Sequence, residues 1–378
     1  MRIGCITTSI VPSKTANSIQ AVKVCHALMQ IGHEVHLWVP EFQRSNWDTI
    51  AEIYGISEQF EITWIPFLPK LKQYDFSWKS VQAAIKWDSD VVYTWALQAA
   101  FFASMRKKPF AMEFHDFPMG FMGPKLFQML MRIQTEKLIM TTTRALATGI
   151  EERFNIKFDQ KNLQIAPNGT DPDRYLDLPT PKDARKTLGL KEGFTVGYTG
   201  HFYPGRGMDL LTNIAKAIPE VHFLWVGGQE KDIEPWKKIL QNQSINNVTL
   251  TGFIPNSKLP MYQAAADILV MPYAKKIEGS SGGNIAPVIN PMKMFDYLST
   301  GRPIIASNIP VFHEILDENT ALLCSPEESE EWVLAIHKFI GNESLRKTMQ
   351  KNALAASEKY SWKNRAKISS EKLKNIIK

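Results

Sequence analysis

The sequence predicts an α/β protein of two domains, each with a parallel β-sheet that is covered by helices on both faces. Short apolar runs typical of buried strands alternate along the chain with stretches of helical spacing. The chain has 378 residues, which is long for one hydrophobic core. The densest cluster of turn residues, PNGTDPDRY, lies at 167–175 between two such series. We therefore expect domains at 1–168 and 169–360, followed by a basic C-terminal helix at 361–378.

Composition and the chain start favour an ordinary globular protein of a reducing compartment. Hydrophobic residues make up 44% and charged residues 22% of the chain. The three cysteines, Cys5, Cys25 and Cys324, are odd in number and unpatterned, which predicts neither a disulfide framework nor a metal site. The opening MRIGCITTSIV lacks a signal-peptide layout, and we found no run of about 18 apolar residues. The expected location is cytoplasmic, with peripheral contact at the inner face of the membrane.

The net charge of +6 is concentrated at the C-terminal end. Residues 363–378 hold six basic side chains and one acidic side chain. Such a segment can contact anionic lipid, or it can form the solvated face of a helix. No basic stripe interleaves with aromatic residues, so nucleic-acid binding is not predicted.

The chain opens with a βαβ unit. RIGCITTSIV predicts a strand, and EVHLWV predicts the next one. Ser18 is expected to cap the helix between them, and Gly32 to end it. The buried face of this helix is predicted to carry Val22, Cys25 and Met29. The first turn lacks G-x-G-x-x-G, which argues against a dinucleotide site.

A candidate functional residue in this half is His115, which directly follows the predicted strand KPFAMEF. In open α/β sheets, ligands gather at the carboxyl ends of strands. The other interpretation is a histidine that only hydrogen-bonds a loop carbonyl. Residues 124–140 predict a helix of the core or an interfacial helix for a lipid substrate. RALATG and NLQIAPNG are expected to form the last strands of this half.

The most informative stretch runs from Asp267 to Asn308 and predicts strand, glycine-rich loop at 275–290, helix and strand. Asn290 is the expected cap of the helix, Pro291 its first residue, and Gly301 its end. Lys293 then falls in the first turn, where the helix dipole disfavours positive charge unless an anion is bound. Asp296 lies about 7.5 Å further along the axis, which suits a carboxylate on a ribose. Alternatively, Lys293 reaches water from a buried crossover helix.

A second phosphate element is predicted after the strand FTVGYTG. The loop HFYPGRGMD offers His201 and Arg206, together with glycines that let the backbone approach a phosphate.

In this order and spacing, the motifs resemble the GT-B glycosyltransferases, in particular glycosyltransferase family 4. The resemblance covers nearly the whole chain and rests on GHEV, PNGTD, YTG with GRGMDLL, VGG, NVTLTGFIP, AAADILVMPY, P-x-K-x-F-D-Y-L-S-T-G-R-P-I-I-A-S and YSW. It implies two Rossmann-like domains facing a cleft, with the acceptor on the first and the donor on the second. We expect the C-terminal helix to return toward the first domain.

The resemblance also implies roles for particular residues. Arg206 and Lys293 match groups that hold the diphosphate, and His115 matches the histidine that faces the reacting sugar. Asp296 matches the second glutamate of a Glu-x7-Glu motif, which holds the ribose. The remaining expected donor contacts are Gly200, His201, Gly228, Phe253, Ile254, Pro291 and Met292.

Three positions depart from the family pattern. Val288 stands where the first glutamate of the motif is expected. Glu278, or the segment with Gly283 and Asn284, is a candidate replacement within an unusually long loop. His201 replaces the usual arginine after Gly200, which leaves Arg206 as the clear cation there.

The sequence-based hypothesis is a retaining, metal-independent hexosyltransferase that uses a UDP- or GDP-linked sugar as co-substrate and no cofactor. Its acceptor would be a glycan, lipid-linked or small molecule of polysaccharide or cell-envelope biosynthesis. Arg206, Lys293 and the helix amides would stabilise the departing diphosphate, while His115 would position the donor sugar or the incoming hydroxyl. The alternatives are a degenerate member that binds nucleotide sugar without catalysis, and a two-domain NAD enzyme that lacks the glycine fingerprint.

Overall fold

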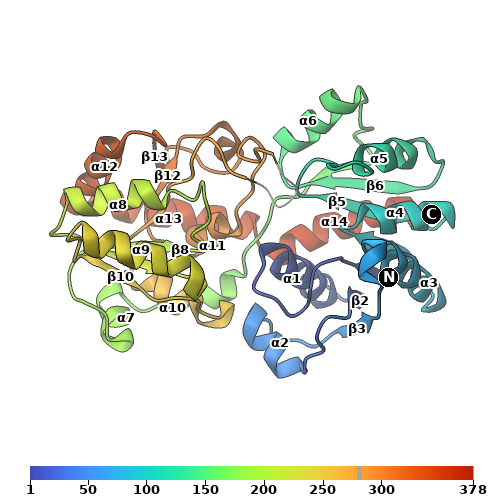
Figure 1. Ribbon diagram of the computed structural model, residues 1–378, viewed down its shortest axis with the longest axis horizontal. Coiled ribbons are helices and arrows are strands. Elements are labelled where there is room, and N and C mark those ends of the chain that lie inside the picture. Colours follow the sequence, from blue (N-terminus) through green and yellow to red (C-terminus); the bar gives the residue numbers. More distant parts are fainter. Residues whose placement is uncertain (279–282, 378) are drawn as a thin grey trace. The chain divides into compact units, whose positions relative to one another are not determined.

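The computed structural model describes residues 1–278 and 283–377, and these residues form two compact units (Figure 1). Unit 1 consists of Met1–Asn168 with Trp362–Lys378, and unit 2 consists of Gly169–Ser361. Each unit has a parallel sheet between layers of helices, which confirms the predicted fold class.

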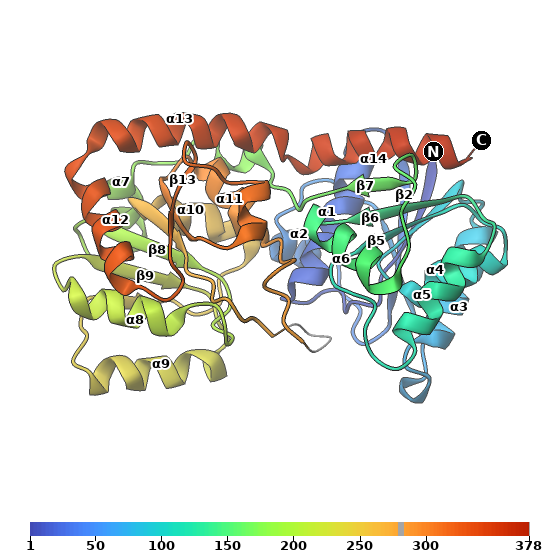
Figure 2. The same ribbon diagram turned by 90° about the horizontal axis from the view of Figure 1, so that it is seen from above.

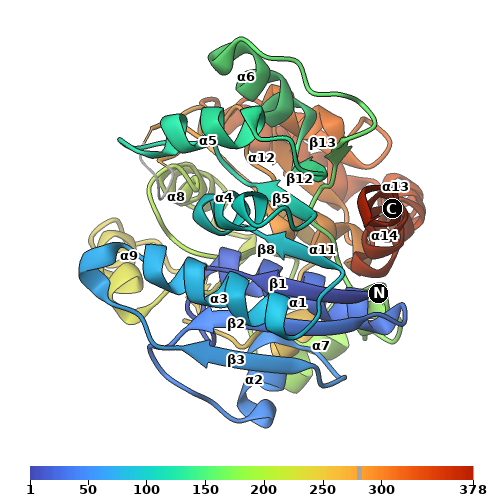
Figure 3. The ribbon, with the colours of Figure 1, turned by 90° about the vertical axis from the view of Figure 1, so that its right-hand side faces the viewer.

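The sheet of unit 1 has the order β3-β2-β1-β4-β5-β6-β7, and every neighbouring pair is parallel. Figure 3 shows β1, β2 and β3 side by side. The strands are β1 (Arg2–Ile6), β2 (Glu34–Pro40), β3 (Glu61–Ile65), β4 (Val91–Thr94), β5 (Phe110–Phe114), β6 (Lys137–Thr141) and β7 (Leu163–Ile165). The central strands β4 and β5 are buried along their whole length, as their apolar sequences require.

Helices cover both faces of this sheet. On one face α1 packs against α14, and on the other α3, α4 and α5 form a row (Figure 2). The helices of unit 1 are α1 (Ala16–Gln30), α2 (Trp47–Tyr54), α3 (Tyr74–Lys86), α4 (Leu97–Met105), α5 (Gly123–Arg132), α6 (Arg144–Phe154) and α14 (Trp362–Ile377). The basic C-terminal segment is therefore a helix of unit 1, and it buries Trp362, Arg365 and Leu373.

Three local predictions in unit 1 are wrong. Residues 124–140 do not form one helix, because α5 ends at Arg132 and the apolar run that follows is the buried strand β6. RALATG is the start of α6 rather than a strand, since the Thr143 hydroxyl accepts a hydrogen bond from Leu146 N and caps a helix there. Ser18 lies inside α1, which already begins after Thr15.

The sheet of unit 2 has the order β10-β9-β8-β11-β12-β13 and is also parallel throughout. Its strands are β8 (Thr195–Thr199), β9 (His222–Val226), β10 (Val248–Leu250), β11 (Ile268–Met271), β12 (Ile304–Ser307) and β13 (Ala321–Cys324). The core under one face includes the fully buried Trp225 and Trp332.

In unit 2, α8 contacts α12 on one face, while α10 and α11 lie on the other with α7 and α13 (Figure 2). The helices are α7 (Pro181–Leu188), α8 (Met208–Ala217), α9 (Glu230–Asn242), α10 (Leu259–Ala264), α11 (Met292–Thr300), α12 (Ser329–Gly341) and α13 (Glu343–Lys359). The strand order reverses direction between β8 and β11. In open parallel sheets such a switch point is where ligands bind, at the carboxyl ends of the strands.

Candidate functional site

The candidate site of unit 2 lies where β8 and β11 end. Gly200 follows β8, and Pro272 and Tyr273 follow β11, so these residues share one edge of the sheet. The helix α11 is anchored to this edge, because the Tyr297 hydroxyl accepts a hydrogen bond of 2.8 Å from the backbone N–H of Thr199. The switch point therefore has a helix N-terminus attached to it.

Two glycines bring the loop after β8 against the segment after β11. Gly205 and Gly207 both have φ of +81°. A Cβ atom at Gly207 would lie 1.7 Å from the Pro272 carbonyl oxygen, so only glycine permits this approach. The close approach places the guanidinium of Arg206 5.0 Å from the centre of the Tyr273 ring.

Lys293 points from the first turn of α11 into the same place. Its Nζ atom is buried and, among the described residues, has no hydrogen-bond partner. It lies 3.8 Å from the centre of the Tyr198 ring and 5.4 Å from that of Tyr273. Burial of the ammonium, and then the charge of Arg206, lower the pKa of Lys293 well below its usual range.

The start of α11 differs from the prediction in a way that bears on this site. The helix begins at Met292 with Pro291 at the N-cap position, and Asn290 precedes the cap. The N-cap residue makes no side-chain hydrogen bond to this end, because proline has no side-chain acceptor. Two cations beside the N-terminus of a helix form an arrangement that a phosphate would satisfy. Gly301 ends the helix with φ of +62°, as predicted.

Asp296 follows one turn later on α11. Its carboxylate accepts a hydrogen bond of 3.2 Å from the Thr170 hydroxyl and another from the Tyr175 hydroxyl. Ser299 in turn donates to Thr170 at 3.1 Å. These hydroxyls hold the carboxylate in one orientation.

The other residues predicted to contact the donor lie in three loops of the same edge. Gly200 has φ of +139°, and a Cβ atom there would lie 2.7 Å from Lys293 Nζ. The ring of His201 stacks on Tyr203, with centroids 4.7 Å apart. Gly228, Phe253 and Ile254 follow β9 and β10, and the backbone bridge between Gly227 and Gly252 joins these two loops.

In the described part of the loop at 275–290, hydrogen bonds converge on Asn284. Its side-chain oxygen accepts from the backbone N–H groups of Ile277 and Ala286, and its nitrogen donates to the Lys275 carbonyl. A bridge pairs Asn284 with Glu278, whose side chain is exposed. Gly283 has φ of +86°. Residues 279–282 of this predicted loop lie outside the described residues.

Val288, at the motif position expected to hold a glutamate, is only 3% exposed. An apolar side chain in the interior supplies no contact to a sugar hydroxyl. Of the two predicted replacements, Glu278 is the acidic one with its side chain in solvent, and Asn284 has its amide engaged within the loop.

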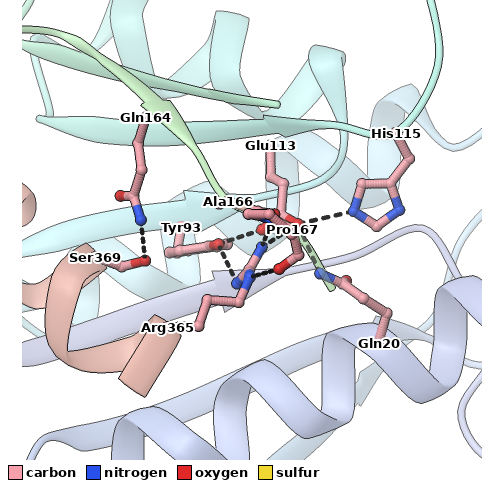
Figure 4. A network of polar contacts seen from close by, with 9 residues as sticks. All are labelled: Gln20, Tyr93, Glu113, His115, Gln164, Ala166, Pro167, Arg365 and Ser369. Carbon is pink, nitrogen blue, oxygen red and sulfur yellow. Dashed lines mark hydrogen bonds and ion pairs between the residues drawn. The ribbon is translucent and has the colours of Figure 1, made fainter. Parts of the chain in front are cut away.

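In unit 1, His115 follows β5 as predicted and is half-buried. Figure 4 shows its Nε2 directed at the carboxylate of Glu113, at 2.8 Å. The structure describes His115 with unit 1 and the other predicted site residues with unit 2.

Sequence reasoning missed several residues that shape these places. Tyr198, Tyr273, Tyr175 and Thr170 surround Lys293 or Asp296, and each lies within a motif whose neighbours were noted. In unit 1 the missed residues are Glu113 and Arg365. A carboxylate in the middle of an apolar strand, as in KPFAMEF, is the signal that could have identified Glu113.

The chain is similar to known proteins both in sequence and in fold. Residues 193–342, within unit 2, match the family model described as glycosyl transferases group 1. The crystal structure of Anabaena Alr3699/HepE in complex with UDP is similar to the whole chain, with a TM-score of 0.76 and 18% identity over 99% of this chain and 100% of that one. Residues 193–342 are therefore homologous to the group 1 glycosyltransferases. The chain as a whole has the GT-B fold.

Two curated relatives match only part of this chain. Alpha-galactosylglucosyldiacylglycerol synthase of Streptococcus pneumoniae is 23% identical over 220 residues, which are 56% of this chain and 54% of that protein. The putative teichuronic acid biosynthesis glycosyltransferase TuaH of Bacillus subtilis is 23% identical over 171 residues, 44% of this chain and 41% of that protein. The matched stretches thus span about half the length of these relatives or less.

The described residues contain neither a membrane-spanning helix nor a cluster of metal-ligating side chains. None of the helices in residues 1–278 and 283–377 has the length and apolar character needed to cross a bilayer. The same residues contain no group of three His, Cys, Asp or Glu side chains placed to hold a metal ion.

Proposed function

We propose that this protein transfers a sugar from a nucleoside-diphosphate sugar to an acceptor hydroxyl. The observation that carries the proposal is the buried Nζ of Lys293, which has no hydrogen-bond partner among the described residues and lies beside Arg206 at the start of α11. A buried ammonium without such a partner costs free energy. A diphosphate between the two cations would offset this cost, because it supplies charge and hydrogen-bond acceptors.

The proposed chemistry is stabilisation of the leaving group. As the glycosidic bond breaks, negative charge builds on the diphosphate, and each preorganised donor is worth roughly 3–4 kcal/mol in such a site. Arg206, Lys293 and the first amides of α11 are the donors, and Asp296 holds the ribose. Because these groups supply the positive charge, we propose a reaction that needs no metal ion. We further propose that it proceeds with retention and that His115 contacts the reacting sugar.

The first test is thermal unfolding with UDP, GDP, ADP, CMP and NAD. A ligand at 100 times its Kd stabilises by about 2.7 kcal/mol. UDP is the first candidate, because the similar Anabaena protein was solved with UDP and with UDP-glucose. The shift should vanish in Lys293→Met and persist in Lys238→Met, which removes an exposed lysine of α9. If no nucleoside diphosphate raises the midpoint, the proposed donor site is wrong.

A second candidate function is nucleotide-sugar binding without transfer. The buried Val288, at the place expected to hold a glutamate, favours it. Release of nucleoside diphosphate from a donor in the presence of an acceptor mixture separates the two. Tight binding with no release would support the binding protein, whereas acceptor-dependent release would eliminate it.

For the acceptor we propose a lipid-linked molecule handled at an anionic membrane surface. One curated relative is named for a diacylglycerol product. In unit 1, Phe121 is 82% exposed beside α5, and the ammonium of Lys125 lies 4.5 Å from its ring centre. Sedimentation with vesicles of anionic lipid at low salt tests the contact. The proposal predicts co-sedimentation that Phe121→Ser weakens, and a protein that stays in the supernatant would refute it.

A further inference from the structure

Glu113 is a buried carboxylate that accepts hydrogen bonds from three other elements and from the loop after its own strand (Figure 4). Its Oε1 atom accepts from Gln20 Nε2 of α1 at 2.6 Å and from His115 Nε2 after β5 at 2.8 Å. The same atom accepts from Arg365 Nη2 of α14 at 2.5 Å. Its Oε2 atom accepts from the hydroxyl of Tyr93 on β4. The carboxylate therefore joins His115 to the C-terminal helix.

Arg365 is itself held by the backbone. Its Nε donates to the Pro167 carbonyl at 2.8 Å, and Nη2 also donates to the Ala166 carbonyl at 3.2 Å. The residue is 6% exposed. The planar guanidinium fits three acceptors at fixed angles, which a lysine cannot reproduce. The position of the positive charge beside Glu113 is thus determined by the segment at the end of unit 1.

The charges fix which nitrogen of His115 carries a proton. Burial alone would raise the pKa of Glu113, but the charge of Arg365 and the contact with His115 outweigh it and bring the pKa to about 2. An ionised carboxylate only accepts hydrogen bonds, so the facing Nε2 of His115 must be the donor. In the neutral ring, Nδ1 is then left as an acceptor on the side away from Glu113.

We propose that Arg365 is a positioning residue for His115, acting through Glu113. The C-terminal helix holds the carboxylate charged and in place, and the carboxylate orients the imidazole with Nε2–H inward and Nδ1 outward. His115 would then accept a hydrogen bond from a ligand hydroxyl through Nδ1. Only the expected effect on turnover rests on the proposed glycosyltransferase function; the orientation of the ring does not.

The test is nuclear magnetic resonance of the full chain with 15N-labelled histidine, assigned with His115→Gln. In the wild type above neutral pH, we expect the proton on Nε2 and a protected, hydrogen-bonded N–H resonance. Arg365→Met should lose this resonance, because the buried carboxylate loses its counter-ion. If that variant does not fold, the pair Glu113→Leu with Arg365→Met removes both charges together and should lose it as well.

The matched control is Arg185→Met. The buried Arg185 forms an ion pair of 2.8 Å with the partly exposed Asp267 in unit 2. Removal of Arg185 therefore also leaves a carboxylate without its counter-ion. The His115 resonance should remain in this variant. A wild-type ring protonated on Nδ1, or a resonance unchanged when Arg365 is removed, would overturn the proposal.

Turnover supplies a second readout. With the donor found in the thermal panel, Arg365→Met should lower kcat at least tenfold while KM for the donor stays within twofold. Equal kcat in Arg365→Met and Arg185→Met would contradict the positioning role. If the wild type turns over no donor, the proposed function fails, whereas the His115 spectrum still decides the present inference.

Discussion

The ammonium of Lys293 lies 3.8 Å from the centre of the Tyr198 ring and has no hydrogen-bond partner among the described residues. The face of an aromatic ring attracts a cation, by about 2 kcal/mol when the pair is desolvated. That attraction replaces only part of the hydration that the ammonium loses on burial. The protein without a bound anion therefore carries a destabilising charge at the start of α11.

Replacement of the Lys293 charge should make the protein more stable and abolish its binding of a nucleoside diphosphate. We expect Lys293→Met to raise the free energy of unfolding by about 1 kcal/mol, equivalent to about 2–4 °C in Tm for a domain of this size. The same variant should lose the thermal shift produced by a nucleoside diphosphate. Calorimetry with and without ligand measures both effects, and Lys238→Met serves as the control. A less stable variant that still binds would contradict the assigned role of Lys293.

The lowered pKa of Lys293 also predicts how stability depends on pH. The folded state releases the proton at lower pH than the unfolded chain, whose lysine pKa is about 10.4. Between these two values the unfolded state binds more protons, so stability rises with pH in that window. Urea unfolding from pH 7 to pH 10 should show this rise in the wild type and a flatter curve in Lys293→Met. If stability depends on pH in the same way in both proteins, the pKa of Lys293 is not lowered in the folded state.

Gly200 supplies a steric test of the same site. A Cβ atom there would meet Lys293 Nζ at 2.7 Å, in a backbone with φ of +139°. Gly200→Ala should displace the ammonium and weaken diphosphate affinity at least tenfold. Gly193→Ala is the control, because its φ is +119° but no atom lies within 4 Å of the added Cβ atom. Isothermal titration with UDP compares them, and equal affinities would refute the steric argument.

The alternation of apolar strands and helices is enough to predict both parallel sheets, since the inner strands are buried on both faces, as β4 and β11 show. Local sequence patterns do not separate a helix from a strand where both have the same apolar composition. The helix α5 and the strand β6 are both rich in Leu and Met, so the sequence predicts one helix over 124–140 where the structure has two elements.

The candidate site was predictable only where its signal is local. Lys293 was recognised because a lysine in the first turn opposes the helix dipole. The rings of Tyr198 and Tyr273 surround it only because β8 and β11 are neighbours in the sheet. Glu113 and Arg365 lie 252 positions apart, and no spacing rule connects them.

A substitution of Asp296 should weaken the binding of ligands that contain a ribose and should not affect the binding of phosphates alone. Hydrogen bonds to a charged group contribute about 1.5–3 kcal/mol. We therefore expect Asp296→Asn to weaken UDP binding by tenfold or more and to leave inorganic pyrophosphate unaffected. Asp177→Asn, at an exposed position, is the control. Equal losses for UDP and pyrophosphate would mean that Asp296 maintains the fold of the site rather than binding the ribose.

Glu113 should govern the stability of unit 1 toward acid. Its pKa of about 2 in the folded state lies below the value of about 4.3 of an unfolded glutamate. A depressed pKa contributes stability that is complete above the unfolded value and is lost as pH falls from about 4.3 toward 2. The contribution is on the order of 3 kcal/mol, since one pKa unit corresponds to about 1.4 kcal/mol.

Glu113→Gln removes this dependence while it keeps the size of the side chain. It leaves Arg365 buried without its carboxylate, so a loss of about 3–5 kcal/mol is expected at pH 7. Between pH 4.3 and pH 2 the difference between the variant and the wild type should shrink, because the wild type then loses the same ion pair. Circular dichroism during acid titration follows both proteins. If the difference in stability between the two proteins stays constant down to pH 2, the negative charge of Glu113 does not stabilise the folded state.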